Sequence, residues 1–267
     1  MSAVRFENVR FSYPSGVEAL RGVSFEVPTG QRLAIVGQNG AGKTTLLRHL
    51  NGIFQPTSGS VFVADAATTG RAIAELAAQV GYVFQNPDEQ IFASTVIADV
   101  EFGPRNLGCS ADEARSRAMA ALETVGLAAE ADTHPLHLSL SERKRVALAG
   151  VLAMQTPIVV LDEPTTGQDA GGVAMVAGVV EALASAGRTV IAITHDMDFA
   201  AEHFDRVVVM AKGEVLADGA PATVFGEADA LARAAVEPPQ LFRLAAHLGW
   251  PDRPLTVEGF VDAFERR

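Results

Sequence analysis

The clearest chemistry in this chain belongs to a glycine-rich loop near the start of the sequence. An apolar run over 33–36 leads into Gly37-Gln-Asn-Gly-Ala-Gly-Lys43-Thr44, which fits the pattern G-x-x-x-x-G-K-T. The glycines let successive backbone N–H groups point at phosphate oxygens, and a helix that starts here adds its positive dipole end. Lys43 can reach the β- and γ-phosphates, and the Thr44 hydroxyl can ligate Mg²⁺. The sequence therefore predicts that a nucleoside triphosphate binds at Gly37, Gln38, Asn39, Gly40, Ala41, Gly42, Lys43, Thr44 and Thr45.

Two carboxylates follow a second apolar run far downstream. Residues 158–161 read Ile-Val-Val-Leu and lead into Asp162 and Glu163. At the carboxyl end of a parallel strand, Asp162 is placed to hold Mg²⁺ through water, and Glu163 projects further toward the γ-phosphate. Glu163 is therefore the candidate base that polarises the attacking water. The alternative is a solvated charge at a strand end.

Three further side chains are candidates for the same site. Gln85 ends an apolar strand, so its amide oxygen can complete the Mg²⁺ shell and its position can report the nucleotide state. His195 follows the strand 190–194, and its imidazole can hydrogen-bond the γ-phosphate or the attacking water. A surface glutamine and an ordinary satisfied histidine are the alternatives. Tyr13 can stack on adenine or, instead, cover the edge of the core.

Composition indicates one large α/β unit with additions. The chain has 267 residues, 48% of them hydrophobic, and it lacks an uninterrupted apolar stretch of about 18 residues. We therefore expect a soluble protein without a membrane span or a signal peptide. The single cysteine, Cys109, leaves no internal disulfide and fits a reducing compartment. The net charge of −11 argues against nucleic acid as a partner, because phosphate backbones attract clustered Lys and Arg.

The patterning of the remaining segments predicts how the site is positioned. Period-two alternation over 4–11 and 20–27 predicts an antiparallel β element ahead of the phosphate loop. The stretch 86–154 has helical periodicity and no strand pattern, so we expect an inserted helical subdomain. Helical segments return after 227. Alternation with helices predicts a parallel sheet from the strands at 158–161, 190–194 and 207–210.

Taken together, these residues resemble the ATPases of ABC transporters over roughly 4–218. The resemblance makes Gln85 the Q-loop residue, Asp169 the D-loop residue beside the nucleotide, and His195 the switch histidine. The wording of 84–90, Phe-Gln-Asn-Pro-Asp-Glu-Gln, and of 95–104, Thr-Val-Ile-Ala-Asp-Val-Glu-Phe-Gly-Pro, is similar to the narrower group that energises energy-coupling factor (ECF) transporters. These are importers of cobalt, nickel and vitamins.

This resemblance implies a fold, ligands and partners. The fold is an α/β P-loop NTPase with a parallel core sheet, an antiparallel β subdomain and an inserted helical subdomain over about 86–154. The ATPase domain covers 1–219, and a helical C-terminal extension covers 220–267. ATP and Mg²⁺ are the implied ligands. The implied partners are a transmembrane coupling subunit and a separate substrate-binding membrane protein, with this chain at the cytoplasmic face of the membrane. Since that separate protein binds the substrate, the transported compound is not encoded here.

Other function classes stay open from the sequence. A soluble ABC ATPase that acts on nucleic acid or ribosomes is disfavoured by the charge, and by a single ATPase unit without a long coiled coil. A small-molecule kinase built on the same phosphate loop is disfavoured by Asp169 and His195 in their family contexts.

The chain departs from the family at its signature motif. Leu138-Ser139-Leu140-Ser141-Glu142 stands where the family has L-S-G-G-Q. In the family, two subunits meet head to tail, so Ser139 is expected to contact the partner's ATP. Leu140 can hinder close backbone approach, and Glu142 is expected to bring a carboxylate toward the anionic ligand. We therefore expect a second, different ATPase subunit as the partner, with a homodimer of two imperfect sites as the alternative.

Overall fold

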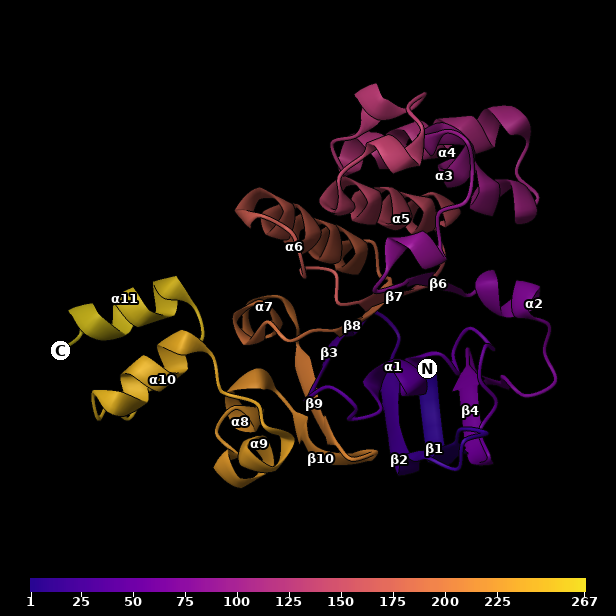
Figure 1. Ribbon diagram of the computed structural model, residues 1–267. Coiled ribbons are helices and arrows are strands. Elements are labelled where there is room, and N and C mark those ends of the chain that lie inside the picture. The colour runs from indigo at the N-terminus through magenta and orange to yellow at the C-terminus, as the bar shows by residue number, and fades with distance from the viewer.

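Two β-sheets form the centre of the protein, and the computed structural model describes all 267 residues (Figure 1). The first sheet is antiparallel, with the strand order β2-β1-β4-β5. It confirms the antiparallel element expected from the period-two pattern: Phe6 and Val9 of β1 are buried, whereas Glu7 and Arg10 are exposed. Its strands are β1 (Ser2–Ser12), β2 (Glu18–Pro28), β4 (Ser58–Val63) and β5 (Ala66–Ala67).

The second sheet has six strands in the order β10-β9-β3-β8-β7-β6, and all pairs except β9 with β10 are parallel. Every residue of β7 and β8 is buried, as expected for strands covered on both faces. Val159 and Leu161 of β7 enter one hydrophobic cluster, whereas Ile158 and Val160 enter the other, because successive side chains alternate between faces. The strands are β3 (Arg32–Val36), β6 (Val80–Val83), β7 (Ile158–Asp162), β8 (Thr189–Ile193), β9 (Arg206–Ala211) and β10 (Glu214–Gly219).

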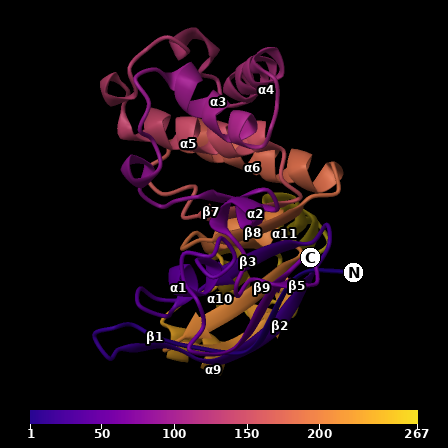
Figure 2. The same ribbon diagram turned by 90° about the vertical axis from the view of Figure 1, so that its right-hand side faces the viewer.

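Helices between β6 and β7 form a separate layer above the sheets (Figures 1 and 2). They are α3 (Val96–Asn106), α4 (Ala111–Thr124) and α5 (Leu140–Met154), so the helical region expected between 86 and 154 is present. Each begins at a side chain that accepts a hydrogen bond from a free backbone N–H, at Thr95, Ser110 and Ser139. Glu101 of α3 is buried, and its carboxylate accepts hydrogen bonds from the exposed Arg105 and Arg115.

The other helices cover the parallel sheet and extend beyond it. Two short helices, α1 (Lys43–Leu47) and α2 (Ile73–Ala77), follow the phosphate loop and β5. Near the parallel sheet lie α6 (Ala170–Ser185), α7 (Met197–His203), α8 (Pro221–Val224) and α9 (Ala228–Ala234). The last two, α10 (Gln240–His247) and α11 (Val257–Glu265), pack on each other around Ala245, Trp250 and Ala263. None of the helices combines the length and hydropathy that crossing a membrane requires.

Candidate functional site

One cavity at the edge of the parallel sheet collects most of the predicted residues. Glu163 follows β7, His195 follows β8, and both face a cavity that is also lined by the exposed Gln85 and the phosphate loop from Asn39 to Thr45. Parallel strands deliver their carboxyl ends to the same edge, which is why segments so far apart in sequence meet here. The phosphate loop in this cavity can bind an anion, and the Glu163 carboxylate can activate a water molecule beside it.

The phosphate loop is held by contacts that only glycine permits. Gly37 has φ +147°, and a Cβ on it would lie 2.1 Å from the carbonyl oxygen of Met210 in β9. The buried Lys43 folds back over the loop, and its Nζ donates to the carbonyl oxygens of Gly37 at 2.5 Å and Gln38 at 3.2 Å. Burial lowers the pKa of Lys43, and the carboxylates of Glu163 and Asp162 oppose that shift. The two hydrogen bonds thus hold the ammonium group against the backbone of the loop.

Oxygen ligands suited to a hard cation lie next to this loop. The hydroxyl of Thr44 donates to Oδ1 of Asp162 at 3.3 Å, and the hydroxyl of Tyr82 donates to Oδ2 at 3.1 Å. Burial raises the pKa of Asp162, while the bonds from Thr44 and Tyr82 lower it. A hydroxyl, a carboxylate and the amide of Gln85 form a donor set that fits Mg²⁺.

The side chains of Glu163 and His195 lie within ion-pair distance of each other. Glu163 is 3% exposed, and its Oε1 lies 2.8 Å from Nε2 of His195. Its Oε2 accepts from the hydroxyl of Thr166 at 3.1 Å. Burial raises the pKa of Glu163 and, together with the charge of Lys43, lowers the pKa of His195. A carboxylate of raised pKa therefore lies beside an imidazole of lowered pKa, which is a suitable arrangement for a general base.

Ser139 and Asp169 lie outside this cavity, each at the start of a helix. Oδ1 of Asp169 accepts from the N–H of Gly172 at 2.8 Å and caps α6. Ser139 caps α5 in a capping box, in which the Glu142 carboxylate accepts from the N–H and hydroxyl of Ser139 at 2.8 and 2.7 Å. The Glu142 carboxylate thus turns onto its own helix terminus and bonds the Ser139 hydroxyl. Its approach to the partner's nucleotide stays a prediction.

Tyr13 contacts both the core edge and the phosphate-loop helix. Its ring packs edge-on against Phe11 and Phe54, with ring centres 5.1 and 5.7 Å apart. Its hydroxyl lies 2.7 Å from Oγ1 of Thr45. This geometry matches the core-edge interpretation and also places a partly buried aromatic ring beside the loop, so adenine stacking stays a prediction.

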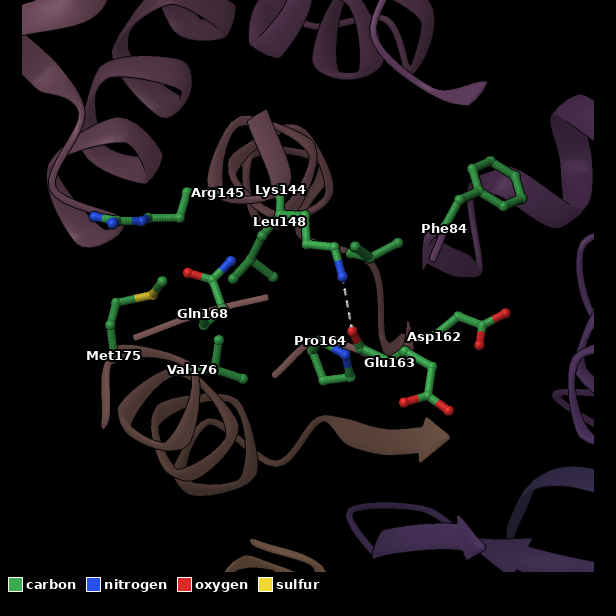
Figure 3. A pocket seen from close by; sticks show the side chains of 11 residues that line it. Phe84, Lys144, Arg145, Leu148, Asp162, Glu163, Pro164, Gln168, Met175 and Val176 are labelled. Carbon is green, nitrogen blue, oxygen red and sulfur yellow. Dashed lines mark hydrogen bonds between the residues drawn. The ribbon is translucent and has the colours of Figure 1, made fainter. Parts of the chain in front are cut away.

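Three side chains at the site were missed by the sequence reading. Tyr82 and Thr166 bond Asp162 and Glu163 directly. Lys144 of α5 donates to the backbone carbonyl of Glu163 (Figure 3). A tyrosine inside an otherwise apolar strand, and a threonine three residues after a candidate base, were available as signals. Nothing in the sequence pairs Lys144 with a loop 19 residues later.

Comparisons with known proteins show the family of the chain. A family model described as ABC transporter matches residues 20–166. An ABC transporter ATP-binding protein of Methanothermobacter marburgensis is 42% identical over 248 residues, which are 91% of this chain and 88% of that protein. The chain therefore belongs to the ABC transporter family of ATP-binding proteins, which confirms the fold class and the ATPase activity expected from the sequence.

Further relatives belong to a narrower group within this family. The energy-coupling factor transporter ATP-binding protein EcfA of Methanocaldococcus jannaschii is 39% identical over 269 residues, covering 100% of this chain and 96% of that protein. Among solved structures, cbiO1 of Clostridium perfringens, part of the ABC transporter complex cbiONQ, aligns with a TM-score of 0.76 and 35% identity. That alignment covers 93% of this chain and 99% of the other. These similarities confirm the resemblance expected from the wording of residues 84–104.

Proposed function

We propose that this chain is the ATP-hydrolysing subunit of an energy-coupling factor importer for a micronutrient, either a vitamin or a transition-metal ion. It acts at the cytoplasmic face of the membrane. The observation that carries this proposal is the pair of Glu163 and His195, which faces the same cavity as the phosphate loop. The similarity to EcfA along the whole chain supports the transport role.

The residues of the cavity have separate tasks in ATP hydrolysis. The loop N–H groups and Lys43 bind the β- and γ-phosphates. The carboxylate of Glu163 accepts a proton from water as the water oxygen bonds to the γ-phosphorus. The bond to the oxygen bridging the β- and γ-phosphates breaks, giving ADP and inorganic phosphate. His195 lies beside the carboxylate and can donate its one N–H to the γ-phosphate.

Magnesium fits the oxygen ligands beside the loop. Thr44, Asp162 and Gln85 would hold it, directly or through water. When bound, Mg²⁺ would neutralise charge on the phosphate oxygens. Tyr82 keeps the Asp162 carboxylate in place by donating to its Oδ2. This task explains a tyrosine hydroxyl buried in the core of β6.

A dimer is needed to complete each ATP site. We propose that Ser139 and Asp169 serve the nucleotide bound by a second ATPase subunit, and that ATP closes the dimer while hydrolysis reopens it. We infer a different subunit as the partner because Leu140, 50% exposed next to Ser139, places a branched side chain where close backbone approach is required. We also propose that the ATPase domain ends near 219 and that 220–267 extend it.

The heterodimer proposal has a specific test. Leu140→Gly in the assembled complex is expected to raise the ATPase rate, because it removes the obstruction over the partner's ATP. Leu136→Gly, a change at a similarly exposed leucine outside the signature, is the matched control. An ATPase rate that Leu140→Gly leaves unchanged would argue against a weakened composite site.

An apolar groove between the sheet and the helical layer offers a surface for the transmembrane coupling subunit. The rings of Phe92 and Phe102, 65% and 48% exposed, meet edge-on at this groove. Exposed aromatic side chains around a groove are typical of an interaction site. We propose that the coupling subunit docks here and receives the motion of the helical layer.

The partner proposal is tested by affinity purification of the tagged chain from detergent-solubilised membranes of its native host. Recovery of a polytopic membrane protein with a second ATPase and a small membrane protein supports the importer. The variant Phe92→Ser/Phe102→Ser is expected to lose the polytopic protein while it keeps nucleotide binding. Recovery of ribosomal or DNA-associated proteins in place of membrane proteins would refute the transport role.

A further inference from the structure

Helix α5 is tied to the loop after β7 by a lysine that spans the gap between them. Nζ of Lys144 donates to the carbonyl oxygen of Glu163 at 3.1 Å and to that of Thr166 at 2.8 Å. Figure 3 shows this side chain reaching from α5 to the backbone of Glu163, on the side opposite the cavity-facing carboxylate. The contact therefore leaves the carboxylate free for His195 and for water.

The backbone of Glu163 explains why it needs such a partner. Its φ is +54°, a left-handed conformation that residues other than glycine adopt rarely and at a cost in free energy. Such a residue persists only where its surroundings fix it. Glu163 donates its N–H to the carbonyl of Ile193, and its carbonyl is fixed by Lys144. Together these two bonds set the direction in which the Glu163 side chain leaves the strand.

A second polar contact holds the same loop to the same helix. The hydroxyl of Ser141 donates to Oε1 of Gln168 at 2.7 Å, and Nε2 of Gln168 donates back to the carbonyl of Ser141 at 3.3 Å. The Gln168 side chain occupies space left by Gly172, where a Cβ would lie 2.4 Å from its Oε1. Ser141 is one of the positions at which the signature departs from L-S-G-G-Q. This departure thus gives the signature segment a direct bond to the loop that carries Glu163.

We propose that Lys144 is a positioning residue for Glu163, and that the Ser141–Gln168 pair holds the loop 163–169 on α5 so that Lys144 can act. This inference rests on the proposed role of Glu163 in ATP hydrolysis. Because Ser139 caps α5, any movement of the signature segment of this chain is transmitted through Lys144 to its own catalytic carboxylate. Lys144 itself does not line the cavity of the phosphate loop.

The test compares Lys144→Met and Lys144→Arg in the assembled complex. Methionine has a similar length but no donor, whereas arginine can still donate to both carbonyls. Lys144→Met is expected to lower kcat about tenfold or more with little change in KM, because misplacement by about 1 Å costs up to about a hundredfold in rate. Lys144→Arg is expected to restore most of kcat. Gln168→Leu is also expected to lower kcat, because it removes the bonds between the loop and α5. Its control is Gln79→Leu, at a partly buried glutamine whose side chain makes no hydrogen bond.

The decisive comparison uses the Glu163→Gln background. If Lys144 acts through Glu163, Lys144→Met will not lower the residual turnover of Glu163→Gln further, since their effects share one interaction. An equal loss in both backgrounds would show a general structural effect and overturn the inference. Hydrogen exchange gives a readout independent of activity: Lys144→Met and Gln168→Leu are expected to accelerate exchange of the amides of 163–169, and unchanged exchange would overturn the inference. An assembled wild-type complex that hydrolyses no ATP would instead refute the proposed function.

Discussion

Replacing Gly37 by alanine tests how the phosphate loop is held against the parallel sheet. The added Cβ would lie 2.1 Å from the carbonyl oxygen of Met210, whereas Cβ contacts under 3.0 Å are essentially never seen. The loop and β9 must therefore separate by about 0.9 Å, the difference between these two distances. Overpacking of this kind costs about 1–3 kcal/mol, and a left-handed backbone on a residue with a Cβ adds about 1–2 kcal/mol. We expect Gly37→Ala to lower the free energy of unfolding by roughly 2–5 kcal/mol.

The matched control for this prediction is Gly70→Ala. Gly70 also has a positive φ, +82°, but a Cβ there would meet nothing within 4 Å. It carries only the backbone cost, about 1–2 kcal/mol. Urea unfolding measures both free energies, and titration with a fluorescent ATP analogue measures nucleotide affinity. We expect Gly37→Ala to weaken nucleotide binding about tenfold or more, because the loop is displaced by close to 1 Å, and Gly70→Ala to leave it unchanged. Equal stabilities and equal affinities for the two variants would refute this account of the loop.

Three further predictions concern other parts of the protein. Arg105→Met/Arg115→Met leaves the buried Glu101 carboxylate without a partner and is expected to lower the free energy of unfolding in urea by about 3 kcal/mol. Adding Glu101→Leu is expected to recover most of that loss. A triple variant no more stable than the double variant would contradict this prediction. Because burial raises the pKa of Glu163 in the folded state, its contribution to stability is lost as the pH rises through that pKa. Glu163→Gln should thus raise the melting temperature of the nucleotide-free chain at pH 8, with a difference that closes toward pH 4, and a difference independent of pH would rule out this cause. Tyr13→Ala is expected to weaken ATP binding about tenfold, since stacking contributes about 1–3 kcal/mol, while Tyr13→Phe binds normally; unchanged affinity in Tyr13→Ala would leave the ring a core-edge role only.

The sequence was sufficient where one local pattern decides the structure. The short apolar runs that became β7 and β8 are entirely buried, and their ends bring Glu163 and His195 to one cavity as predicted. One strand end differed: Gln85 was expected to end a strand, but β6 ends at Val83 and Gln85 lies beyond it in an exposed bend.

Features that depend on tertiary contacts could not be predicted. The left-handed backbone of Glu163 is stabilised by Lys144 and by Ile193, and only the folded chain brings these residues together. The sequence alone does not show whether the Glu142 carboxylate faces solvent, a ligand or its own helix terminus. In the folded chain it faces the helix terminus and forms a capping box there. Sequence patterns identify which side chains can act, whereas packing decides which atoms they meet.

We propose that the Glu163 carboxylate drives ATP hydrolysis, whereas the phosphate loop binds ATP without it. The most direct measurement is the steady-state ATPase rate of Glu163→Gln in the assembled complex, together with its ATP affinity and ATP-dependent dimerisation. Glu214→Gln, the same change at an exposed strand residue, is the control. Removal of a general base predicts a loss of turnover of about a hundredfold or more, with ATP affinity and dimerisation retained. Turnover equal to that of the control would contradict the account.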